Sequence, residues 1–171
     1  MYHASFILLS GVLLLIAISD IRRRQIALYY FGLLGIAVAG FALLRADGLL
    51  LMKNMLINSL LLSLMLGGLY FFYRMKYGKD RSQLFTKLGT GDLLFWLLLT
   101  PLFAPVNFLN WMIGSFTVCL LLTLALHMGS HKTQTIPLAG YQAIVLIIIL
   151  CINQYWLRYN LFEENLFLPA L

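Results

Sequence analysis

The chain alternates between long apolar runs and short polar segments, a pattern typical of helices that cross a membrane. Six apolar runs follow one another: residues 5–19, 26–44, about 54–73, one that begins at Asp92, about 109–127, and one that begins at Ile136-Pro137. Two prolines interrupt the fourth run, and Pro137 suits the first turn of the sixth helix. The pattern predicts an all-α, polytopic membrane protein with about six transmembrane helices, formed by one domain over residues 1–171.

Composition supports the same class. Of the 171 residues, 62% are hydrophobic and only 11% are charged, which is typical of an integral membrane protein. The first run has no positive segment ahead of it and no small-residue cleavage pattern after it. We therefore expect it to be a transmembrane helix and not a removable signal peptide.

The net charge of +6 predicts an orientation rather than a nucleic-acid partner, because the basic residues cluster in short loops between apolar runs. On alternate sides of the predicted membrane, nine Lys and Arg residues stand against three. The larger group is Arg22, Arg23, Arg24, Arg74, Lys76, Lys79, Arg81, Lys87 and Lys132, and the smaller group is Arg45, Lys53 and Arg158. The positive-inside rule then places both termini outside and the basic loops in the cytosol, where phospholipid headgroups are their expected partner.

One acidic residue, Asp92, enters the fourth run directly after Gly89-Thr90-Gly91. The two glycines favour a sharp, partly left-handed turn that delivers the carboxylate to the first position of a helix. Helix capping alone is one explanation, because Asp is a good N-cap and its charge suits the positive end of the helix dipole.

A second acid, Asp20, makes a functional explanation competitive with capping. Asp20 closes the first run and Asp92 opens the fourth, and the two runs between them return the chain to the same side. Both carboxylates are therefore expected at the cytosolic edge of the membrane. An ionisable residue at membrane depth is costly and marks a functional site by default.

Two carboxylates that meet in a partly dry site can share one proton, because like charges at short distance cannot both ionise cheaply. The ionised member can then deprotonate a water while the protonated member polarises a peptide carbonyl, as in aspartic proteases. The helix dipoles favour Asp20 as the protonated member, but the arginines after Asp20 oppose this, so the assignment stays open.

Three segments resemble the type IV prepilin peptidases, the bacterial branch of the GxGD aspartyl proteases. They are Ser19-Asp20-Ile21-Arg22-Arg23-Arg24, Gly89-Thr90-Gly91-Asp92 and Ile136-Pro137-Leu138-Ala139-Gly140-Tyr141. The resemblance implies that Asp20 and Asp92 are the catalytic pair, supported by Gly89, Thr90, Gly91 and Pro137. It also implies a substrate, a pilin-like precursor whose short leader is cut at the cytosolic face of the bacterial inner membrane.

The chain departs from this family in three ways. Gln25-Ile26-Ala27 stands where the family usually has Ile-Pro-Asn, and Leu94 stands where a Lys is common. The cytosolic insert with paired CxxC motifs, associated with N-methylation of the cut product, is missing. We therefore expect the short form of the family without methyltransferase activity, and the first two differences leave room for an inactive homologue.

The principal alternative is a small transporter or a non-catalytic subunit of a secretion or pilus machine, in which the two acids couple to ions or hold helices together. No cofactor or metal is expected. His127 and His131 stand four residues apart without a third ligand, and no His-Glu-x-x-His motif occurs. Cys119 and Cys151 are expected to be buried, unpaired thiols, and Ser115 a packed hydroxyl.

Overall fold

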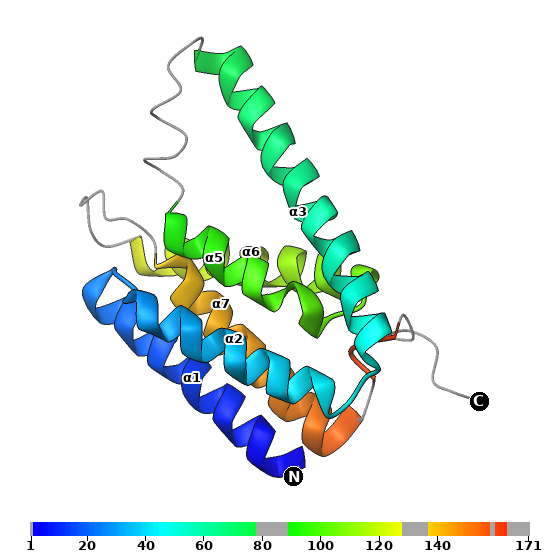
Figure 1. Ribbon diagram of the computed structural model, residues 1–171. Coiled ribbons are helices and arrows are strands. Elements are labelled where there is room, and N and C mark those ends of the chain that lie inside the picture. The colour runs from blue at the N-terminus through cyan, green and yellow to red at the C-terminus, as the bar shows by residue number, and fades with distance from the viewer. Residues whose placement is uncertain (1, 78–88, 128–136, 158–159, 164–171) are drawn as a thin grey trace.

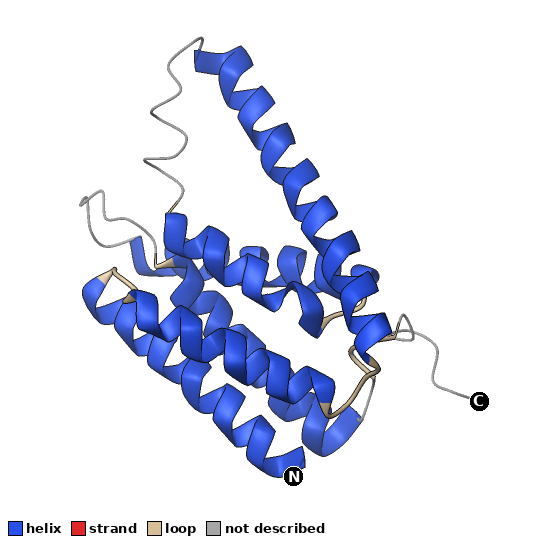
Figure 2. Ribbon diagram, in the orientation of Figure 1, coloured by secondary structure: helices blue, strands red, loops and turns tan. Residues whose placement is uncertain are grey.

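The computed structural model describes residues 2–77, 89–127, 137–157 and 160–163, and within these ranges all regular structure is helical (Figures 1 and 2). Its elements are α1 (Tyr2–Arg23), α2 (Leu28–Leu43), α3 (Gly48–Tyr77), α5 (Thr90–Leu99), the 3-10 turn η1 (Thr100–Leu102), α6 (Pro105–His127), α7 (Leu138–Ile152) and the π-helical turn η2 (Asn153–Leu157). The all-α prediction is confirmed for the described residues.

In the part of the chain that the structure describes, four helices are long and apolar enough to cross a membrane. Their apolar stretches are His3–Arg23, Gly48–Lys76, Pro105–Ala125 and Leu138–Trp156. The remaining two apolar helices, Leu28–Leu43 and Thr90–Leu102, are shorter than the roughly 20 residues that a perpendicular span requires. Large apolar side chains such as Leu28, Leu49 and Ile7 are exposed, which suits a surface covered by lipid tails.

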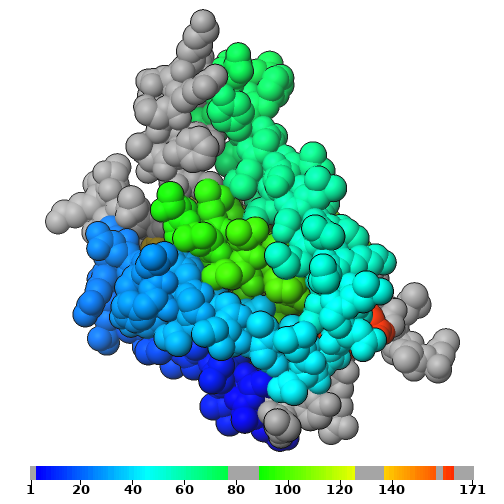
Figure 3. Space-filling model, in the orientation of Figure 1, coloured from blue at the N-terminus to red at the C-terminus, as the bar shows by residue number. Residues whose placement is uncertain are grey.

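The helices differ in how closely they pack. Helix α1 lies against both α7 and α2, and α5 lies between α2 and α3 on the face shown in Figure 3. Helix α3 packs mainly on η1, and its C-terminal part leads away from the other described helices (Figure 1). In the most apolar 18-residue stretch of α3, only 11% is buried, whereas 33% of the corresponding stretch is buried in α1 and in α7. The bundle is therefore tight around α1 and α7 and loose at α3.

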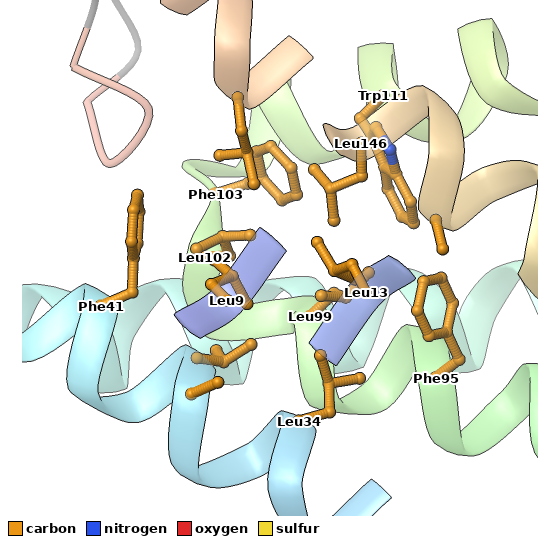
Figure 4. Close-up of a cluster of buried hydrophobic side chains, with 14 of the residues drawn as sticks. Leu9, Leu13, Leu34, Phe41, Phe95, Leu99, Leu102, Phe103, Trp111 and Leu146 are labelled. Atoms are coloured by element: carbon orange, nitrogen blue, oxygen red, sulfur yellow. The ribbon is translucent and has the colours of Figure 1, made fainter. Parts of the chain in front are cut away.

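One hydrophobic core joins the helices (Figure 4). Leu9 and Leu13 of α1, Leu34 of α2 and Leu146 of α7 are fully buried. Aromatic rings fill the space between α5, η1 and α6, where Trp111 stacks on Phe103 with 5.6 Å between ring centroids. These contacts fix the relative positions of α1, α2, α5, α6 and α7.

Neutral amides hold the bundle together at the end where α3 begins, which we call the amide end. Asn58 donates to the carbonyl oxygens of Thr100 and Phe103 at 2.7 and 2.8 Å. Asn54 donates to the carbonyl oxygen of Phe162, and Asn107 donates to those of Leu161 and Glu163. The segment 160–163 is thereby tied to α3 and α6, with Leu161 and Phe162 buried.

The predicted element boundaries need correction at several points. Helix α3 begins six residues earlier than the predicted third run, and α6 begins at Pro105, because proline is tolerated in the first turn of a helix. The fourth run is a ten-residue helix that ends in η1 at Pro101, where the ring removes a backbone donor. These shifts leave the order of the elements unchanged.

Candidate functional site

Asp20 lies in the last turn of α1 and is buried, with 7% of its surface exposed. Its Oδ2 accepts a hydrogen bond of 2.7 Å from the backbone N–H of Gly140. Helix α1 ends just beyond it, where Arg24 adopts a left-handed conformation (φ 52°) and its N–H bonds to the carbonyl oxygen of Asp20. This turn closes the helix and leaves Asp20 directed at α7.

Asp92 is the third residue of α5 and is half-buried. Its Oδ1 accepts a hydrogen bond of 3.1 Å from the backbone N–H of Ala139. The carboxylate also interacts with the backbone of Gly89, the N-cap of the same helix. The prediction that Asp92 occupies the first helical position is therefore wrong by two residues, and its capping contact resembles that of an acid at N3.

The two carboxylates meet on neighbouring residues of a third helix. Ala139 and Gly140 belong to the first turn of α7, whose backbone N–H groups have no partner within the helix. Asp20 and Asp92 satisfy one of these donors each, which brings the two carboxyl groups close together. The ends of α1, α5 and α7 thus form one acidic site, which we call the acid end (Figure 1).

Gly140 allows α1 and α7 to approach closely at the acid end. A Cβ atom at this position would lie 3.1 Å from Cγ1 of Ile21 and 3.2 Å from both Cβ and Oδ2 of Asp20. These distances are shorter than ordinary carbon contacts, so any larger residue would displace the Asp20 side chain. Gly140 belongs to the third sequence motif, but nothing in that motif indicates this role.

Gly89 leaves room for the Asp92 carboxylate. Its φ of −63° and ψ of 131° are extended, so the expected left-handed turn is not formed at Gly89. A Cβ atom here would lie 2.9 Å from Oδ2 of Asp92, a distance that real Cβ atoms essentially never show. The physical reason for glycine at this position is therefore space for the carboxylate and not backbone conformation.

The remaining motif residues shape the entry to the helices. Thr90 begins α5 and is exposed, and Gly91 follows it beside Phe31, which its Cβ would contact at 3.6 Å. Pro137 is the N-cap of α7, one position before the predicted first turn, and its carbonyl oxygen accepts from the N–H of Tyr141. Their part at the site is to set how α5 and α7 begin.

Other predicted features lie outside the described residues. These are Lys79, Arg81, Lys87, His131, Lys132, Ile136 and Arg158. Of the two positions at which the chain departs from the prepilin peptidase pattern, Leu94 is 38% exposed on α5, and the carbonyl oxygen of Gln25 accepts from the Ser19 hydroxyl. Within the described ranges, no group of three metal-ligating side chains comes together.

A network of three buried polar side chains, not predicted from the sequence, lies about one helical turn from the two acids. Trp96 of α5 donates its Nε1–H to Oε1 of Gln142 on α7 at 2.6 Å, and Nε2 of Gln142 donates to the Ser115 hydroxyl on α6 at 3.1 Å. The expected packed hydroxyl at Ser115 is buried as predicted, but it also takes part in this network. A single amide within the apolar run of α7 is the sequence feature that could have indicated the network.

Chemically, the acid end offers two carboxylates that can exchange one proton between them. Such a pair can act as general acid and general base on a water, or it can hold helices together. Comparison with protein-family models, with curated proteins and with solved structures finds no match to this chain. The resemblance to prepilin peptidases therefore rests on the motifs of the sequence.

Proposed function

We propose that this chain is a membrane aspartyl endopeptidase that removes the short leader of pilin-like precursors, with Asp20 and Asp92 as its general acid/base pair. The observation that carries the proposal is the meeting of these two carboxylates, from helices far apart in sequence, on adjacent backbone amides of α7. The prepilin peptidase motifs support the substrate class. The membrane-facing helices support a substrate that is itself held in the membrane.

In this mechanism one carboxylate is ionised and the other is protonated. The ionised acid takes a proton from a water as the water oxygen attacks the scissile carbonyl carbon, and the protonated acid donates its proton to the carbonyl oxygen. The acid that took the proton of the water then donates it to the leaving nitrogen, and the C–N bond breaks. As the tetrahedral intermediate collapses, the other carboxylate takes back a hydroxyl proton, which restores one ionised and one protonated acid. The hydrogen bonds from Ala139 and Gly140 orient both carboxylates.

The proposed orientation follows from the charge pattern. Arg22, Arg23 and Arg24 begin two residues after Asp20, whereas Arg45 and Lys53 lie at the amide end. Under the positive-inside rule the acid end faces the cytosol of a bacterial inner membrane and both termini lie outside. Six spans are consistent with this arrangement if α2 and the helix Thr90–Leu102 cross together with the four longer helices.

The experiment is cleavage by the purified protein in lipid nanodiscs. Pilin-like precursors from the same genome serve as substrates, and mass spectrometry identifies the trimmed N-terminus. Asp20→Asn and Asp92→Asn keep a side-chain oxygen that accepts the backbone N–H, but they cannot ionise. Asp47→Asn is the matched control, because Asp47 is an exposed acid at the amide end.

We expect wild-type protein and Asp47→Asn to trim a precursor, and both site variants to lose activity by about 10³-fold or more. If either Asp20→Asn or Asp92→Asn cleaves at the wild-type rate, the shared-proton mechanism is wrong. If the wild-type protein trims no precursor, the endopeptidase assignment fails.

The second candidate is an inactive homologue, a small transporter or an assembly subunit. One observation favours it: each carboxylate satisfies an N–H group of α7 that would otherwise lack a partner, which is a structural role sufficient in itself. This candidate predicts no cleavage by the wild-type protein. It also predicts normal assembly of both Asn variants, which co-purification with pilus or secretion components would measure.

A further inference from the structure

A hydrogen-bonded chain of three buried side chains crosses the bundle beneath the acid end. Trp96, Gln142 and Ser115 are at most 1% exposed, and they join α5 to α7 and α7 to α6. Burying an amide in an apolar core is costly unless its polar atoms are paired. Here both ends of the Gln142 amide are paired, so the network holds Gln142 in one orientation.

The network lies in register with the two acids. Trp96 stands four residues after Asp92 on α5, and Gln142 stands three residues after Ala139 on α7. Residues three or four apart share a helix face and lie about 5–6 Å apart along it. Helices α5 and α7 are therefore joined by two successive hydrogen bonds, first Ala139 to Asp92 and then, one turn deeper, Trp96 to Gln142.

This second connection matters because α5 packs against α7 over a smaller surface than α1 does. Helix α1 packs along α7, so Asp20 and the Gly140 amide move as one unit. Helix α5 packs more on α2 than on α7, so its hydrogen bonds to α7 are a large part of the direct connection between these two helices. The angle between α5 and α7 sets where Asp92 lies relative to Asp20.

We propose that Trp96 and Gln142 are positioning residues for the acid pair: their hydrogen bond fixes α5 against α7 and thereby sets the separation of the Asp20 and Asp92 carboxylates. That this separation serves peptide cleavage rests on the proposed function. Ser115 is the outer support of the pair, since its hydroxyl accepts from Gln142 and donates to the carbonyl oxygen of Met112.

The test compares two tryptophan variants that differ in one property. Trp96→Phe removes the indole N–H that Gln142 accepts and keeps an aromatic ring. Trp111→Phe is the matched control, because Trp111 is also buried, at 4% exposed, and its Nε1 has no hydrogen-bond partner among the described residues. Both variants make a similar change in ring volume, so a loss of packing alone affects them alike. Thermal unfolding of the purified proteins checks this.

We expect Trp96→Phe to lower kcat by about 10- to 100-fold with little change in KM, because the carboxylates are displaced and substrate binding is not. Its pH–rate profile should also change, since the spacing of two coupled carboxylates determines how far apart they titrate. Trp111→Phe should keep both kcat and the profile. If Trp96→Phe keeps the wild-type kcat and profile, or if Trp111→Phe changes them equally, the positioning role is wrong.

A measurement without substrate separates this inference from the proposed function. Infrared difference titration follows the carboxyl bands of the Asp pair, and Asp20→Asn and Asp92→Asn identify these bands. A changed titration in Trp96→Phe but not in Trp111→Phe supports positioning even if no precursor is cleaved. An unchanged titration in both variants overturns it.

Discussion

At both ends of the bundle, polar side chains join helices by pairing with backbone groups, but the two ends use different side chains. At the amide end, Asn54, Asn58 and Asn107 donate to backbone carbonyl oxygens that need a donor. At the acid end, Asp20 and Asp92 accept from backbone N–H groups that need an acceptor. Asn also offers an acceptor oxygen, so the hydrogen bonds at the acid end do not require a charge.

The comparison of the two ends shows which features are not required to hold the helices together. Neutral amides suffice to join helices at one end, and they cannot change protonation. The acid end places two carboxyl groups beside each other and buries one of them, so that ionising both would cost stability that neutral residues would avoid. A cost of this kind at one end only is the pattern expected where a site is built for chemistry.

The largest expected difference between the ends is in pH dependence. Cleavage should follow a bell-shaped profile, because below its optimum both carboxyls are protonated and no base remains, and above it both are ionised and no acid remains. Activity should fall by about tenfold per pH unit on each limb. Initial rates of precursor trimming across pH measure this, with thermal unfolding at each pH as the control. A flat profile would contradict acid/base sharing.

The next largest effect is expected for Gly140→Ala. The added methyl would press on Asp20 and Ile21 at distances of 3.1 to 3.2 Å, so the carboxylate must move. We expect a loss of activity of about 10- to 100-fold. Gly114→Ala is the matched control, because a Cβ atom at Gly114 meets nothing within 4 Å. Equal activity of the two variants would show that close approach at Gly140 is unimportant.

At the amide end we expect a loss of stability without a change in chemistry. Asn58→Leu removes the donor to the carbonyl oxygens of Thr100 and Phe103 and leaves both buried. The free energy of unfolding should fall by about 1–3 kcal/mol, measured by denaturation in detergent. The remaining folded protein should keep its kcat and pH profile, and Asn110→Leu, at an exposed position, is the control. A changed pH profile in Asn58→Leu would remove the contrast between the ends.

The smallest effect is expected for Asn54→Ala, which removes a single hydrogen bond to the carbonyl oxygen of Phe162. We expect a loss of about 1 kcal/mol, smaller than that of Asn58→Leu. Limited proteolysis after Phe162 should become faster at the same time, because this bond ties segment 160–163 to α3. Equal losses in the two Asn variants would show that the number of hydrogen bonds does not set the stability of this end.

The sequence predicted those parts of the molecule that follow from hydrophobic periodicity. The order of the helices followed from the apolar runs, and the shared side of Asp20 and Asp92 followed from the two runs between them. Periodicity says nothing about contacts between distant residues. It therefore did not reveal that both acids bind the first turn of α7, that Gly89 and Gly140 leave room for them, or that Trp96 reaches Gln142.

The amide end was missed for a related reason. Asn54 and Asn58 lie inside the predicted third run, and Asn107 lies just before the predicted fifth run. An isolated amide changes the mean hydropathy of such a run very little. Their partners are backbone carbonyl oxygens at helix ends, and every helix has such groups. Only the packed structure shows which carbonyl each amide reaches.

Helix α3 is longer than a membrane span requires. Its 30 residues correspond to about 45 Å, longer than the roughly 30 Å hydrocarbon layer, and its amides anchor it in the first half alone. A helix that is held at one end and is longer than the hydrocarbon layer adjusts to the thickness of that layer by tilting. The tilt angle of α3 should therefore vary with lipid chain length, whereas the tightly packed helices α1 and α7 should keep their tilt angles.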